Sequence, residues 1–175
     1  MQGNLFKKPP KYVIDSSSLM DIFGDTPWIS KEINPGLWQA IEEMIKEGEI
    51  ISHAEVLSEI KKDGTKGNEL YTWAHTNHEV FRSHDISLEG AVIRGMTTKY
   101  KAFVNNKVNS VHADPWIIAQ AKVQGLTLIT EEKFTTSTNP EKIKIPNVCQ
   151  DTDYNIPCID LWGLTVERGW RFGVR

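Results

Sequence analysis

Short apolar runs alternate with helical patterns along this chain, and this alternation restricts the fold more than any other feature. The run Tyr12–Ile14 stops at Asp15, and the serines that follow form a strong helix-start signal because hydroxyl side chains can cap free backbone N–H groups. Two further runs, 49–52 and 126–129, are also flanked by apolar residues at helical spacing. Right-handed crossovers place such strands parallel in one sheet with helices on both faces. We therefore expect a three-layer α/β/α fold with a central, mostly parallel sheet.

The segments between the apolar runs carry the expected helices. Gly48 and Gly125 each follow a helical pattern and are placed to end it, and Pro115 stands at a favoured first-turn position. A last strand is expected over 142–146 and a short terminal helix over 159–170. The expected helices cover about 19–23, 37–47, 53–62, 67–75, 86–104 and 116–124.

The length of 175 residues predicts a single domain, 1–175, with a core at about 11–150 and a C-terminal helical tail at 151–175. No apolar run is long enough to span a bilayer, so we expect no membrane segment. The first residues are polar and basic rather than like a secretory signal, which predicts a cytoplasmic protein. The net charge of −3 argues against a surface that coats nucleic acid but allows local contacts with a few phosphates.

Acidic residues follow the predicted strands at the places where ligands bind in parallel sheets. Asp15 ends the first run, Glu131 and Glu132 follow the third, Asp114 opens the helix before it, and Glu59 lies on the helix after the second. In such sheets, ligands bind outside the carboxyl ends of the strands. Clustered carboxylates suit Mg²⁺ or Mn²⁺, and such ions can activate a water for phosphodiester hydrolysis. Taken alone, each acid is more typical of a helix cap or a solvated surface position than of a metal site, and only their joint placement favours the metal site.

Four segments resemble the motifs of PIN domains, in the same order. In 11–19, an apolar run is followed by Asp, any residue and Ser, and in 51–60 a glutamate precedes an aliphatic residue. In 113–121, an Asp begins a helix that carries alanines. The fourth segment is 128–134. This resemblance covers about residues 11–150. It implies the three-layer fold and a nuclease site, and the segment 145–149 is similar to bacterial PIN-like toxins.

The resemblance implies a role for each acid. Asp15, Glu59 and Asp114 match metal-site acids, and Ser17 matches the residue that orients the first Asp. The family's fourth acid is an Asp, and here that position is Glu132. Glu131 is an alternative to Glu132 for the fourth position, and Glu55 is an alternative to Glu59 for the second.

The function implied is a metal-dependent endoribonuclease that uses Mg²⁺ or Mn²⁺, as the toxin component of a toxin–antitoxin pair. Its expected partners are RNA, an antitoxin protein and, for a homodimer, a second copy of the chain. A catalytically inactive PIN-like module that binds RNA or protein is the first alternative. A phosphotransfer protein with Asp15 as nucleophile is the second, but Ser17 stands where such phosphatases need a second Asp.

A basic and aromatic cluster in and just after the predicted helix 86–104 has two interpretations. Lysines that contact phosphates and aromatic rings that stack on bases suit a groove for single-stranded RNA. A solvated helix with its aromatic rings turned to the core has the same pattern. The cluster consists of Arg94, Lys99, Tyr100, Lys101, Phe103 and Lys107.

Overall fold

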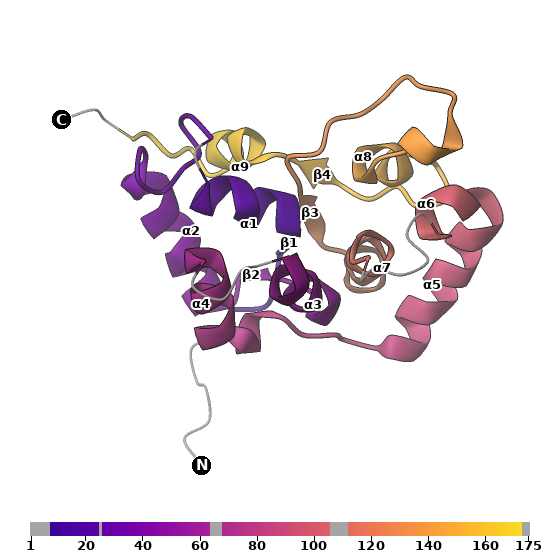
Figure 1. Ribbon diagram of the computed structural model, residues 1–175, viewed down its shortest axis with the longest axis horizontal. Helices are drawn as coiled ribbons and strands as arrows, with labels where there is room; N and C mark the ends of the chain where they lie inside the picture. Colours follow the sequence, from indigo (N-terminus) through magenta and orange to yellow (C-terminus); the bar gives the residue numbers. More distant parts are fainter. Residues whose placement is uncertain (1–7, 25, 64–67, 106–111, 173–175) are drawn as a thin grey trace, which may run out of the picture.

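The computed structural model describes residues 8–24, 26–63, 68–105 and 112–172 of the chain. In this part of the chain, four parallel strands form one sheet in the order β2-β1-β3-β4 (Figure 1). The predicted α/β/α fold with a parallel sheet is therefore confirmed. The strands are β1 (Tyr12–Ile14), β2 (Ile50–Ile51), β3 (Thr127–Ile129) and β4 (Cys158–Ile159).

Helices surround the sheet on both sides. Figure 1 shows α1, α2 and α4 on one side of the strands and α5, α6 and α7 on the other. The longer helices are α1 (Ser16–Phe23), α2 (Pro35–Glu47), α3 (Ala54–Asp63), α4 (Glu69–Thr76), α5 (Ile86–Lys99) and α7 (Asp114–Gln124). The shorter ones are α6 (Lys101–Asn105), α8 (Ile145–Cys149) and α9 (Leu161–Glu167), with 3-10 turns η1 (His78–Val80) and η2 (Pro140–Lys142).

The helix α7 is the central helix of the structure. It packs against β1 and β3 on one side and against α5 on the other. Pro115 and the five consecutive residues 117–121 are buried, which is the pattern of a helix enclosed on most sides. Gly125 ends it with φ at +66°, a left-handed conformation that favours glycine. The first residue of α7, Asp114, therefore has a rigid support.

The predicted strand over 142–146 is wrong. This segment forms η2 and then α8, in which Pro146 occupies the first turn, where a proline needs no N–H partner. The fourth strand is β4, which lies in the predicted helical tail and pairs with β3. The terminal helix α9 accordingly begins at Leu161, with the Asp160 side chain as its cap.

The single helix predicted over 86–104 is also wrong, because it is divided into α5 and α6 at Tyr100. Tyr100 leaves the helical conformation, with φ −123° and ψ 47°, and the chain turns into α6. Lys107 of the predicted basic cluster lies outside the described residues. In the described ranges, no helix combines the length and the apolar character that crossing a membrane requires.

Candidate acidic site at the sheet edge

A cavity of about 310 Å³ lies at the carboxyl ends of β1 and β3. Four of the predicted acids line it, and each comes from a different segment: the end of β1, the middle of α3, the start of α7 and the loop after β3. The sheet order explains this meeting, because β1 and β3 are neighbours and their carboxyl ends point to the same edge. The four acids are Asp15, Glu59, Asp114 and Glu132.

Asp15 is almost completely buried and is held by three donors. Its Oδ1 accepts a hydrogen bond from Ser18 N at 2.9 Å, which caps α1. Its Oδ2 accepts from Ser17 Oγ at 2.7 Å and from Thr130 Oγ1 at 2.6 Å. Burial raises the pKa of Asp15, and these hydrogen bonds oppose the rise. The helix-cap and cavity-lining interpretations of Asp15 therefore both hold.

Glu59 lines the cavity, and its competitor Glu55 does not. Ser16 Oγ donates to Glu59 Oε2 at 2.6 Å, so the start of α1 fixes a carboxylate of α3. Glu55 lies one turn earlier, in the first turn of α3, where its backbone N donates to His53 Nδ1 at 3.0 Å.

Asp114 is surrounded by other acids and is largely shielded from solvent. About a quarter of its side chain is exposed, and His112 Nδ1 lies 3.7 Å from its Oδ2. Among the described residues, no donor makes a hydrogen bond to this carboxylate. Burial, followed by the charges of Glu132, Glu59 and Asp15, raises the pKa of Asp114 to about 8. The cavity therefore holds more negative charge than its surroundings neutralise.

The two glutamates after β3 point in different directions. Glu132 lines the cavity, where its Oε1 accepts from Lys144 Nζ at 2.7 Å and its Oε2 from Ile145 N at 2.9 Å. Glu131 instead accepts from Leu161 N at 2.7 Å and thereby caps the start of α9 together with Asp160. Of these two glutamates, only Glu132 joins the other acids.

The donor chemistry of this cavity fits a hard divalent cation, although no metal cage is already formed. In the described part of the chain, no group of three or more His, Cys, Asp or Glu side chains is arranged to hold a metal ion. Mg²⁺ usually binds through one or two carboxylates and retains several waters, so it does not need such a cage. Asp114 is the acid best suited to such an ion, because it lacks a donor among the described residues and is repelled by its neighbours.

Two residues of the site were missed in the sequence. Thr130, which binds Asp15, directly follows β3, and a hydroxyl residue at a strand end was the available signal. Lys144, which binds Glu132, comes from a segment predicted to be a strand, and the sequence contains no local signal for this ion pair.

The chain belongs to the family described as a domain of unknown function (DUF4411), whose family model matches residues 12–172. This range includes β4 and α9, so the match extends over the predicted tail as well as the acidic cavity. No curated protein and no solved structure matches the chain.

Proposed function

We propose that this protein is a metal-dependent endoribonuclease that hydrolyses RNA phosphodiester bonds with Mg²⁺ or Mn²⁺. The observation that carries the proposal is the meeting of Asp15, Glu59, Asp114 and Glu132 in one cavity at the carboxyl edge of a parallel sheet. The resemblance to PIN domains places metal-site acids at the same positions.

The charge of the cavity supports this chemistry. The raised pKa of Asp114 reflects burial and mutual repulsion among the acids, and a bound divalent cation would relieve this repulsion. Such an ion would supply an activated water and stabilise charge on the phosphate. The residues of the chain would hold the ion and the phosphate in place, with Asp15 fixed by Ser17 and Thr130.

The biological role that we propose follows from the resemblance to bacterial PIN-like toxins. In this role, the protein cleaves RNA in the cytoplasm and a cognate antitoxin protein restrains it. The substrate of such an enzyme is single-stranded RNA, whose backbone and bases are accessible outside a duplex.

A catalytically inactive binding module is the second candidate, and one observation favours it. Lys144 already places a cation against Glu132 inside the cavity. An ammonium group that pairs with one of the four acids lowers the negative charge that a metal ion would otherwise have to balance. Titration with Mn²⁺ separates the two candidates, because an ion that binds the folded state raises the melting temperature. A melting temperature that stays constant at millimolar Mn²⁺ would favour the inactive module.

The decisive experiment compares two site variants with the wild type and with one matched control. Asp114→Asn and Glu59→Gln should lower the rate of RNA cleavage in Mn²⁺ by at least about a hundredfold, because each loses a carboxylate of the cavity. Glu55→Gln is the control for Glu59, since it changes a glutamate on the same helix outside the cavity. Asp114→Asn should be at least as stable as the wild type, because burial and the neighbouring carboxylates disfavour the charged form of Asp114 and the amide carries no charge. Wild-type cleavage rates in both site variants would refute the proposed site.

A further inference from the structure

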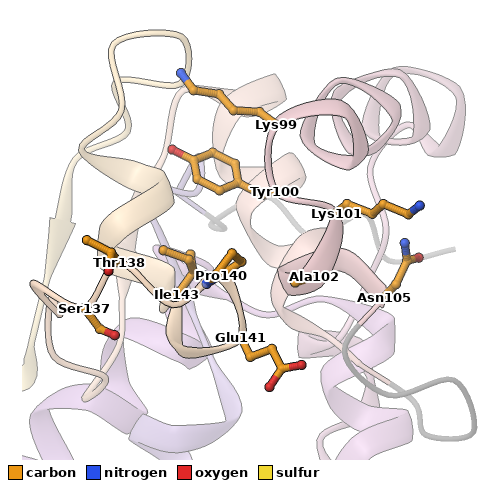
Figure 2. Close-up of a pocket in the computed structure, with 10 residues that line it drawn as sticks. All are labelled: Lys99, Tyr100, Lys101, Ala102, Asn105, Ser137, Thr138, Pro140, Glu141 and Ile143. Atoms are coloured by element: carbon orange, nitrogen blue, oxygen red, sulfur yellow. The ribbon is translucent and has the colours of Figure 1, made fainter.

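A second and larger cavity of about 690 Å³ adjoins the acidic one, between α6 and the segment 137–143 (Figure 2). Glu141 and Ile143 line both cavities, so the two form neighbouring parts of one depression. The larger volume lies within the range of about 300–1,000 Å³ that is typical of ligand sites. A molecule that extends beyond the acidic cavity on this side therefore enters a space large enough for a nucleotide.

The apolar part of the larger cavity is rigid. Ala102, Pro140 and Ile143 contribute to its lining, beside the ring of Tyr100. The Tyr100 hydroxyl donates to Asp151, which ties the ring to the loop after α8. Flat, fixed apolar surfaces of this kind suit a nucleobase, which can stack without losing much freedom in the protein.

One cation of this cavity is available for a phosphate. Lys99 is not, since its ammonium group pairs with Asp151 at 2.6 Å and with Asp153 at 2.8 Å. Lys101 is exposed and makes no ion pair in the part of the chain that the structure describes. Asn105 lies one turn further along α6 and therefore on the same face as Lys101.

The opposite wall supplies polar groups that can reach the edge of a base. Figure 2 shows Ser137 and Thr138 across the cavity from Lys101 and Asn105, with Pro140 and Ile143 between them. The cavity thus combines a cation, hydroxyl and amide groups and an apolar surface, with the Glu141 carboxylate at its border with the acidic cavity that suits a metal-bound phosphodiester. A base with its attached phosphate has this same combination of chemistry.

We propose that this cavity binds the nucleotide of a single-stranded RNA that is adjacent to the phosphate cleaved in the acidic cavity. The base lies against Tyr100 and Ile143, and Lys101 contacts the flanking phosphate. This inference rests on the proposed ribonuclease function, because the phosphate bound in the acidic cavity determines which nucleotide of the RNA lies in the larger cavity.

Binding of a fluorescently labelled single-stranded RNA of mixed sequence to the full chain tests this inference. The measurement is made in Mn²⁺ at times too short for cleavage, which a gel of the recovered RNA verifies, so that the acidic cavity keeps its ion. Fluorescence anisotropy gives Kd at several salt concentrations. Lys101→Ala should weaken binding and reduce the slope of log Kd against log salt by about 0.7, the value for one phosphate contact on a single strand. Lys46→Ala is the matched control, since Lys46 is an exposed helix lysine on α2, on the other side of the sheet (Figure 1).

A second variant tests the space itself. Ala102→Leu adds an aliphatic side chain to the cavity lining without an aromatic surface on which a base could stack, and leucine suits a helix. It should raise Kd about tenfold and leave the salt slope unchanged, because no charge is altered. Melting curves of both variants verify that they are folded.

The outcomes separate this inference from the proposed function. The nucleotide site would be overturned if Lys101→Ala and Ala102→Leu bound RNA as tightly as the wild type does. The same result is expected if the cavity binds a polypeptide segment. In that case, cleavage in Mn²⁺ would still show the nuclease. Reduced RNA binding in both variants, with no cleavage by the wild type, would instead retain the nucleotide site and refute the nuclease. A wild-type chain that binds no RNA overturns the inference directly.

Discussion

Lys144 Nζ lies 2.7 Å from Glu132 Oε1, so one of the four acids of the cavity is paired with a cation from the chain itself. Half of the Lys144 side chain is exposed, whereas Glu132 is largely buried. The pair therefore joins a group that can move into solvent to one that is held by Ile145 N as well. This relationship leads to a direct test of competition between the lysine and a metal ion.

Removing Lys144 should strengthen metal binding. In Lys144→Ala, Mn²⁺ no longer competes with an ammonium group for Glu132, and its affinity should rise by up to about fivefold, since a half-exposed ion pair contributes about 1 kcal/mol or less. The measurement is the shift of melting temperature with Mn²⁺ concentration. Lys142→Ala serves as the control, because Lys142 is an exposed neighbour that does not line the cavity. Equal metal affinity in both variants would show that Lys144 does not compete.

Thr130→Val should destabilise the fold. This substitution retains the shape of the side chain but removes the donor to the buried Asp15 carboxylate. The cost should be about 1–3 kcal/mol, because the buried carboxylate loses one of its three donors and retains its desolvation penalty. Urea denaturation gives the free energy of unfolding.

The control for Thr130 is Thr165→Val. The Thr165 hydroxyl is also buried, but it donates to a helix carbonyl of Leu161 within α9, so its loss should cost about 1 kcal/mol or less. A loss of stability in Thr130→Val no larger than in this control would contradict a special role for the bond to Asp15.

Acid should weaken the fold through Asp151. Burial alone would raise the pKa of this carboxyl, but the hydrogen bonds from Lys99 and Tyr100 outweigh burial and lower the pKa to about 2. Because the unfolded chain takes up this proton near pH 4, the stabilisation is complete above about pH 4 and disappears as the pH falls towards about 2. The melting temperature of Asp151→Asn should therefore lie below that of the wild type at pH 7, and the difference should shrink between pH 4 and 2.

Asp153→Asn is the control for this titration. Asp153 also pairs with Lys99, but two thirds of its side chain is exposed, so its contribution to stability should be small. A constant difference between Asp151→Asn and the wild type across this pH range would exclude Asp151 as the titrating group.

The sequence was sufficient for the central strands and for the meeting of the acids. β1, β2 and β3 are short apolar runs bounded by polar residues, and each lies within the predicted range. Once these strands are parallel, the topology brings their carboxyl ends to one edge, which is why Asp15 and Glu132 line one cavity.

The segment 142–146 shows where sequence patterns are insufficient. Isoleucines alternate with lysines in it, which is the period of a strand, but Pro146 occupies the first turn of α8, and of the two isoleucines only Ile145 is buried. The strand β4 has only two residues, and neither is fully buried, so its pattern is too short to be distinguished from a loop. Its pairing with β3 depends on contacts between distant segments.

The C-terminal helix α9 should be essential to the stability of the folded domain. Leu164 on α9 is fully buried, so Leu164→Ala should lower the free energy of unfolding by about 2–5 kcal/mol through lost burial and the cavity that remains. Val166, two residues later on the same helix, is mostly exposed, and Val166→Ala should change the stability by no more than about 0.5 kcal/mol. Urea denaturation compares the two variants. If Leu164→Ala proved as stable as Val166→Ala, α9 would not be packed against the core in solution. The hydrogen bond from Leu161 N of α9 would then not explain why Glu131 turns away from the acidic cavity.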